Sequence, residues 1–344
     1  MITKLVLEDG TSVEGRSFGY NTSVTGEVVF ATGMTGYPEA FTDPSFAGQI
    51  LVLTYPIIGS YGVPEKKYWE SGRLQISGLI VSTYNDTPSH YQSRSTLQEW
   101  LIREKIPALE VRDTRFLTKK IRMHGALLGK IVNGKNISFA DPNKENLVSK
   151  VSQKSITIEG SGPRTLVQID CGTKRNITKC LTKRNVRIIT VPWNVNPLSL
   201  KEKFDGIIVS NGPGDPTMVP QTIKNVQELM NRKVPMLGIC LGNQIIALAA
   251  GGKTQKLKFG HRGQNQPCLL VGTKRCYLTT QNHGYVVSKV PNGFHQWFIN
   301  ANDQSNEGLI HKTLPIMSVQ FHPEANPGPI DTEWIFDDFL KRIK

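Results

Sequence analysis

The spacing of hydrophobic and polar residues changes partway along the chain. Up to about residue 134, short β-like runs alternate with turn clusters, and residues 95–104 and 114–124 have the spacing of amphipathic helices. Beyond residue 164, strand-like and helix-like runs alternate, which is typical of βαβ units and a parallel sheet. These patterns predict an α/β protein, with an N-terminal α+β domain followed by a domain that has a central, mostly parallel sheet and flanking helices.

The boundary between these domains is expected where the periodicity fades. Residues 135–163 are rich in Asn, Lys and Ser and contain Asp-Pro and Gly-Ser-Gly-Pro breaks. We therefore expect a domain over residues 1–134, a linker over 135–163 and a second domain over 164–344. The expected strands are residues 4–7, 27–30, 49–53, 79–81, 128–132, 165–169, 186–191 and 206–209, and the expected helices of the second domain include 174–183, 221–232 and 331–343. Residues 32–38 and 42–46 are expected to be loops, and residues 252–324 short strands and turns.

Charge and hydropathy exclude some classes of function. The 344 residues include 41 Lys and Arg against 28 Asp and Glu, a net charge of +13, which makes nucleic acid a partner to consider. The basic residues are spread out, however, and no stacking aromatics lie among them. We interpret the densest basic run, residues 174–187, as a solvated helix face. No apolar stretch is long enough to cross a bilayer, so we expect neither nucleic acid nor a membrane as partner.

Cysteine usage and the N-terminus bear on the compartment. Five cysteines, an odd number without C-x-x-C pairs, favour a reducing compartment and argue against a disulfide framework or a zinc site, and we expect no metal. The N-terminus enters a strand pattern at once, without a secretory core or a presequence. We expect a bacterial cytoplasm, or the stroma of a chloroplast or other plastid that carries the gene itself.

Cys240 is the first candidate for chemistry. It lies between the apolar run 234–239 and a helical pattern from residue 241, and Gly238 and Gly242 flank it with the spacing of a strand-to-helix nucleophile elbow. The helix N-terminus at such a turn favours a thiolate and can stabilise an oxyanion. A cysteine in this position can equally be a small buried hydrophobe, so the surrounding residues must decide.

A cysteine nucleophile needs a base, and the base needs a group that orients it. His322 follows the apolar run 316–319, and Glu324, two residues later, projects to the same side of the chain. His283 is an alternative base but has no neighbouring carboxylate. His322 could also be a satisfied core histidine. In an α/β-hydrolase the acid precedes the histidine, so the order found here disfavours that family.

Several motifs together resemble known families. Gly-Ile-Cys-Leu-Gly-Asn-Gln at 238–244, Asn-Gly-Pro-Gly-Asp at 211–215 and His-Pro-Glu at 322–324 resemble the signatures of class I, triad-type glutamine amidotransferase domains. Met-Thr-Gly-Tyr at 34–37 and Thr-Asp-Pro-Ser at 42–45 resemble the N-terminal domain of the small, glutamine-hydrolysing chain of carbamoyl-phosphate synthetase. The resemblance covers essentially the whole chain.

The resemblance implies a role for each matched residue. Cys240 would attack the glutamine carbonyl, His322 would carry the proton, and Glu324 would orient His322. The N–H groups of Leu241 and Gly214 would form an oxyanion hole. The implied glutamine-binding residues are Ser45, Gly212, Gly214, Leu241, Gln244, Asn282, Gly284 and Tyr285. Two positions depart from many relatives, which carry His in place of Asn243 and an aromatic residue without a hydroxyl in place of Tyr285.

The resemblance also implies a partner. In the family the small chain makes ammonia, which passes to a large chain that uses bicarbonate and ATP with Mg to form carbamoyl phosphate for arginine and pyrimidine biosynthesis. We therefore expect no cofactor in this chain, and a complex with the large chain that is a heterodimer or a higher oligomer. The alternatives are a stand-alone Cys-His-Glu hydrolase, such as a γ-glutamyl peptidase, and a non-catalytic scaffold that has kept the fold.

Overall fold

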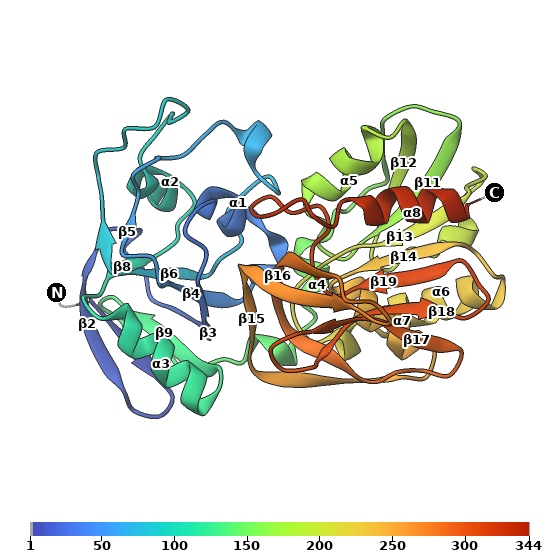
Figure 1. Ribbon diagram of the computed structural model, residues 1–344. Helices are drawn as coiled ribbons and strands as arrows, with labels where there is room; N and C mark the ends of the chain where they lie inside the picture. The colour runs from blue at the N-terminus through green and yellow to red at the C-terminus, as the bar shows by residue number, and fades with distance from the viewer. Residues whose placement is uncertain (1–2, 344) are drawn as a thin grey trace. The chain divides into compact units, whose positions relative to one another are not determined.

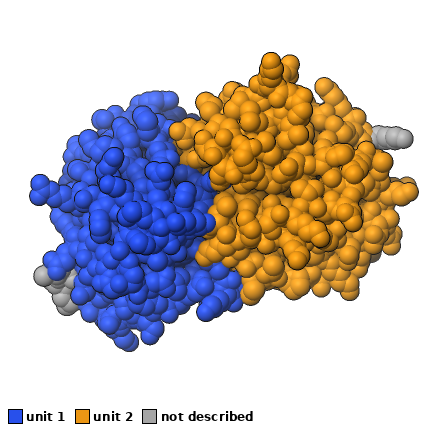
Figure 2. All heavy atoms as spheres, turned by 60° about the horizontal axis from the view of Figure 1, so that its bottom comes forward, with its two compact units in different colours: residues 1–145, 258–262 blue, residues 146–257, 263–344 orange. Residues whose placement is uncertain are grey.

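The computed structural model describes residues 3–343, which form two compact units (Figure 1). Unit 1 comprises residues 1–145 with 258–262, and unit 2 comprises residues 146–257 with 263–344; Figure 2 colours them separately. The division falls inside the segment 135–163, and the domain limits expected from the sequence remain a prediction. That segment is not irregular throughout, because it contains η3 (Pro142–Lys144), α4 (Val148–Val151) and β10 (Thr157–Glu159).

Unit 1 is built on a closed barrel with the strand order β1-β2-β8-β6-β4-β3-β9. Its strands are β1 (Thr3–Leu7), β2 (Ser12–Ser17), β3 (Val24–Ala31), β4 (Gln49–Leu53), β6 (Gly78–Val81), β8 (Ala108–Glu110) and β9 (Leu127–Val132). Strands β3, β4, β6 and β8 are mutually parallel, and the remaining pairs are antiparallel. A small separate sheet joins β5 (Ile57–Ile58) to β7 (Thr83–Tyr84). The parallel strands therefore end together at one rim of the barrel.

Two helices cover the barrel from different sides. Alternate residues of each strand point to opposite faces, so Val28 and Val29 belong to two different hydrophobic clusters. One cluster includes Trp100 of α2 (Leu97–Arg103), and the other includes Leu117 of α3 (Thr114–His124). Burial of these apolar faces explains why the two amphipathic patterns in this part of the sequence predicted helices at the right places.

Unit 2 contains a ten-stranded mixed sheet with the order β10-β12-β11-β13-β14-β19-β18-β17-β15-β16. Strands β12 (Val186–Pro192), β11 (Arg164–Asp170), β13 (Gly206–Val209), β14 (Met236–Ile239) and β19 (Ile316–Val319) form its parallel centre. The other strands are β15 (Lys253–Leu270), β16 (Cys276–Lys289), β17 (Phe294–Asn300) and β18 (Asn306–His311). The expectation of a mostly parallel sheet thus holds for the centre, while antiparallel strands make up the rest.

Helices cover both faces of the parallel centre (Figure 1). One hydrophobic cluster joins the sheet to α6 (Pro220–Asn231) and α7 (Leu241–Ala249), and another joins it to α5 (Arg175–Thr182) and α8 (Trp334–Arg342). This arrangement confirms the predicted α/β class. None of the helices in the described part of the chain is long and apolar enough to cross a membrane.

Two expectations about local structure were wrong. The expected loops 32–38 and 42–46 each run into helical structure, because a short helix, α1 (Tyr37–Thr42), joins them and is followed by the 3₁₀ turn η1 (Pro44–Phe46). Tyr37 and Phe41 are buried, so tertiary packing stabilises a helix that is too short to be stable alone. The region after residue 252 is only partly made of short strands: β17, β18 and β19 are short, but β15 and β16 run for 18 and 14 residues.

Candidate active site

Cys240 occupies a strained turn between β14 and α7, as its sequence context predicted. It has φ 54° and ψ −103°, and its N–H donates to Val319 O at 2.8 Å. The flanking positions must be glycine because neighbouring backbone atoms approach them too closely for a side chain. A Cβ on Gly238 would lie 2.7 Å from the Gly242 carbonyl, and a Cβ on Gly242 would lie 2.0 Å from Val209 O. Strain of this kind is characteristic of functional sites.

His322 and Glu324 are brought to the same edge of the sheet because β14 and β19 pair in parallel. Ile239 lies opposite Val319, so the residues that follow the two strands leave the sheet side by side. His322 Nδ1 and Glu324 Oε1 are 2.6 Å apart, and both side chains are buried. A backbone bridge to Thr280 of β16 holds His322 in place, since its N–H donates to Thr280 O at 2.9 Å.

The other ring nitrogen of His322 is available for chemistry. Among residues 3–343, His322 Nε2 has no hydrogen-bond partner, although it is buried. The Cys240 thiol donates to Asn282 O at 3.7 Å. Since Nδ1 is engaged by Glu324, a proton that leaves a reacting group can be taken up only at Nε2.

Lys174 is a member of the site that the sequence interpretation missed. We expected the basic run 174–187 to be a solvated helix face, but Lys174 is 2% exposed. Its Nζ lies 3.1 Å from Glu324 Oε1 and also donates to Ala325 O. Lys174 directly precedes α5, after the carboxyl end of β11, and this position beside the neighbouring parallel strands is the signal that could have revealed it.

Arg184, at the end of the same basic run, is not free in solvent either. Its guanidinium pairs with Asp337 of α8 at 2.8 Å and with Glu333 at 3.0 Å. The run therefore consists partly of structural cations, one at the His322–Glu324 pair and one that fixes α8 against α5. The interpretation of the run as a solvated face is therefore wrong for Lys174 and Arg184, while Lys183 is exposed.

Burial and charge set the protonation of the pair. Burial alone would raise the pKa of Glu324, but Lys174 and then His322 outweigh it and lower this pKa to about 2. Burial alone would lower the pKa of His322, but the Glu324 carboxylate and the Cys240 thiol raise it to about 10 despite the opposing charge of Lys174. The arrangement thus favours an ionised carboxylate and an imidazole that readily holds a proton.

The structure places most of the predicted glutamine-binding residues in unit 2. Gly212 and Gly214 lie in the loop after β13, Leu241 and Gln244 on α7, and Asn282, Gly284 and Tyr285 on β16. Gln244 Nε2 donates to Tyr285 O at 2.8 Å, so α7 and β16 are linked beside Cys240. Ser45 belongs to unit 1, in η1, where its N–H donates to Asp43. Its place in a glutamine site remains a prediction.

His283 does not have the surroundings of a base. Its Nδ1 lies 3.0 Å from Tyr285 O and its Nε2 lies 3.1 Å from Gln281 Oε1, so both ring nitrogens are engaged. The structure therefore favours His322. Asn243, one of the two unusual positions, is fully buried and bridges Ser318 and Gln320 through its side-chain amide, which is a structural role.

Comparison with known proteins agrees with this geometry. Residues 167–342 match the family glutamine amidotransferase class-I, and residues 5–131 match the carbamoyl-phosphate synthase small chain, CPSase domain. The human protein named carbamoyl-phosphate synthase (ammonia), mitochondrial, is 46% identical over 354 residues, which cover 99% of this chain and 24% of that protein. The multifunctional protein CAD of Squalus acanthias is 48% identical over 354 residues, which cover 98% of this chain and 16% of that protein. The chain spans a quarter or less of the length of these relatives. This chain belongs to the carbamoyl-phosphate synthase small-chain family and is its glutamine amidotransferase part, with a CPSase domain followed by a class I amidotransferase domain.

Proposed function

We propose that the chain hydrolyses L-glutamine to glutamate and ammonia with Cys240 as nucleophile and His322 as acid and base. The observation that carries this proposal is the set of buried groups beside the elbow. A strained cysteine lies at the N-terminus of α7, and a histidine next to it has one ring nitrogen bound to a carboxylate and the other without a partner among residues 3–343. A cysteine that only filled the core would not need these neighbours.

The proposed reaction proceeds in two steps through a thioester. The Cys240 sulfur attacks the side-chain carbonyl carbon of glutamine, the carbon–nitrogen bond breaks, and the proton held on His322 Nε2 goes to the leaving ammonia. His322 then removes a proton from water, which attacks the thioester, and the Cys240 sulfur leaves as glutamate forms. Glu324 acts throughout by holding the ring of His322 and stabilising its protonated form.

The negative oxygen of each tetrahedral intermediate needs hydrogen-bond donors. We propose the N–H groups of Leu241 and Gly214 for this role, since neither has a hydrogen-bond partner among the described residues. Leu241 is the first residue of α7, where the helix dipole adds to the effect. Gly214 has φ 84°, a conformation that glycine adopts without strain and that turns this part of the loop backbone.

Glutamine recognition is proposed for the residues carried over from the family motif, namely Ser45, Gly212, Gly214, Leu241, Gln244, Asn282, Gly284 and Tyr285. The contact between Gln244 and Tyr285 supports this for α7 and β16. Gly212 supports the same proposal for the loop after β13. A Cβ at this position would lie 2.1 Å from Cys171 O, so any larger residue would displace the loop from its present position. The thiol, imidazole and carboxylate suffice for the reaction, so the proposal includes no cofactor in this chain.

We further propose that the ammonia passes to a large chain that makes carbamoyl phosphate, and that unit 1 docks on this partner. The support is the match of residues 5–131 to the small-chain CPSase domain and the greater length of the relatives. The ATP and Mg site would then lie on the large chain, and the product would serve arginine and pyrimidine biosynthesis. All five cysteines are free, which supports a reducing compartment such as a bacterial cytoplasm or a plastid stroma.

Ammonia release from glutamine by the purified chain tests the proposal. Cys240→Ala is expected to lower kcat by roughly 10³-fold or more, because the proposed route has no second nucleophile. Cys276→Ala, which changes an exposed cysteine, is the matched control and should keep full activity. Addition of a synthetase large chain should stimulate release. Equal activity in both variants, or no release even with the large chain, would instead favour the scaffold interpretation.

A further inference from the structure

A pocket in unit 1, far from the cysteine in sequence, lies where four parallel strands end. Ala31 of β3 pairs with Leu53 of β4, and Val52 of β4 pairs with Ile80 of β6. Extending this register to the strand ends places Thr32, Thr54 and Ser82, each the first residue after its strand, in one row. The fourth strand, β8, leads directly into α3. Ligands of parallel sheets bind at the carboxyl ends of the strands, so this row marks a position suited to binding.

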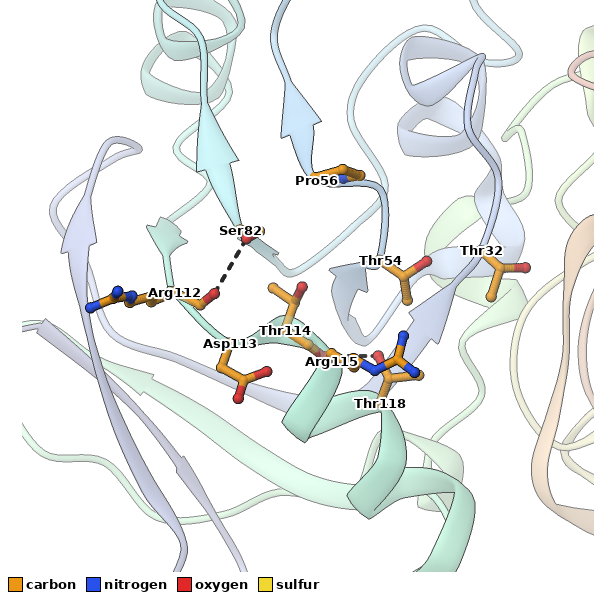
Figure 3. Close-up of a pocket in the computed structure, with 9 residues that line it drawn as sticks. All are labelled: Thr32, Thr54, Pro56, Ser82, Arg112, Asp113, Thr114, Arg115 and Thr118. Carbon is orange, nitrogen blue, oxygen red and sulfur yellow. Dashed lines mark hydrogen bonds between the residues drawn. The ribbon is translucent and has the colours of Figure 1, made fainter.

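The pocket is large enough for an organic molecule. Its volume is about 430 Å³, within the range of ligand pockets. Besides the row of hydroxyls, its lining includes the residue that caps α3 and three residues from the first two turns of that helix (Figure 3): Asp113, Thr114, Arg115 and Thr118. All of these residues belong to unit 1.

Thr114 is the feature that points to a ligand. Its side chain is 4% exposed and projects into the pocket (Figure 3), yet its hydroxyl has no hydrogen-bond partner within residues 3–343. The rest of the residue is buried and its hydroxyl lines the pocket, so a bound group can serve as the hydrogen-bond partner of this hydroxyl.

The first turn of α3 adds donors and positive charge. The Asp113 carboxylate caps the helix by accepting from Phe116 N at 2.8 Å, which leaves the N–H groups of Thr114 and Arg115 as the free donors of the turn. The Arg115 guanidinium reaches toward Thr54 at the pocket, whereas Arg112 points away (Figure 3). Asp113 is the one acidic side chain at the pocket, and its charge is partly satisfied by the cap. Donors of this kind at a helix N-terminus suit an anion.

The row of hydroxyls adds a second requirement. Thr54 donates its proton to Ala31 O at 3.2 Å, and Ser82 donates to Arg112 O at 3.3 Å. Thr32 donates in the same way to Arg262 O, at 3.5 Å. In this arrangement the oxygens present lone pairs that can accept hydrogen bonds from a ligand.

We propose that this pocket binds a phosphate or carboxylate group on α3, carried by a molecule whose hydroxyl or amino groups donate to the row of hydroxyls. The anionic group accepts from Thr114 Oγ1, the two free N–H groups and Arg115. Either a free small molecule or an acidic side chain of a partner chain has this chemistry, and the experiment separates these two sources.

Binding is measured on the full chain by following the backbone amide resonances of Thr114 and Arg115 during titration with inorganic phosphate and with glycerol 3-phosphate. Both anions should bind saturably, and glycerol 3-phosphate more tightly, since its hydroxyls can donate to the row. Thr114→Val and Arg115→Gln should each weaken binding about tenfold, or about 1.4 kcal/mol. Arg122→Gln, an exposed change in the last turn of α3, is the matched control and should bind as the wild type does. No saturable shift, or equal affinities in all three variants, would overturn the proposal.

A second arm identifies the source of the anion and rests on the proposed function. If the group belongs to the synthetase large chain, phosphate should compete with that chain and Arg115→Gln should weaken the complex. If the ligand is a free small molecule, neither effect should appear while the amide shifts persist. The titration itself requires neither glutamine nor a partner. If no anion binds, the glutaminase proposal still stands, and if the chain releases no ammonia, the result of the titration still stands.

Discussion

Replacing Lys174 with Met should destabilise unit 2, because it removes the cation that pairs with a buried carboxylate. The Lys174 and Glu324 side chains are 2% and 0% exposed, with Nζ and Oε1 3.1 Å apart. Removing one partner of a buried pair leaves an uncompensated charge and costs roughly 3–5 kcal/mol. The pKa of Glu324, about 2 against its usual 4.5, gives a similar figure, since a difference of about 2.5 corresponds to about 3 kcal/mol. His322 supplies part of that figure, so the share of Lys174 is smaller, and we expect the free energy of unfolding to fall by about 2 kcal/mol at neutral pH.

The pH dependence gives this loss a signature. The pKa of Glu324 is lowered in the folded chain, so the stabilisation from its ionised form is present above its usual pKa of 4.5 and is lost as pH falls toward about 2. The difference between wild type and Lys174→Met should therefore be constant from about pH 5 to 7 and shrink below about pH 4.

Guanidinium unfolding across this pH range measures the effect, with Lys183→Met as the control because Lys183 is an exposed lysine at the end of the same helix. The double variant Lys174→Met/Glu324→Gln should regain a large part of the loss, because no buried carboxylate is then left unpaired. A loss below about 1 kcal/mol in the single variant, or losses that simply add in the double variant, would refute the role assigned to this pair.

Two further changes test the packing around the site. Gly242→Ala should destabilise unit 2 by more than about 2 kcal/mol in thermal unfolding, because its Cβ would lie 2.0 Å from Val209 O, whereas Gly72→Ala, with open space around it, should be nearly neutral. Arg184→Met should cost about 0.5–1 kcal/mol, a modest value because Asp337 is half exposed to solvent. Arg184 lowers the pKa of Asp337, so this cost should appear above the usual pKa of Asp337, 3.8, and vanish in more acidic solution. A cost that is the same above and below this pKa would contradict the pairing.

The local pattern of the sequence determined most of the fold that carries the site. The 3.6-residue spacing of apolar positions located α3 and α6, and the continuous apolar runs located β13 and β19, because each of these elements buries one face or both. Around Cys240 the glycine spacing by itself predicted the elbow. Such a turn leaves no room for a Cβ at the flanking positions, so the need for glycine is visible in residues close to Cys240 in the sequence.

Tertiary structure decided the features that depend on residues distant in sequence. Lys174 lies 150 positions before Glu324, and only the parallel order of β11, β13, β14 and β19 brings their ends together; from composition alone it was one basic residue among many. Thr114 is likewise an ordinary first residue of a helix until the register of the barrel strands places three hydroxyls beside it. A periodic pattern reports which face of an element is buried, but the partner of a buried polar group is set by the topology of the sheet, because hydrogen bonds and ion pairs act over a few ångströms in space and carry no signal along the chain.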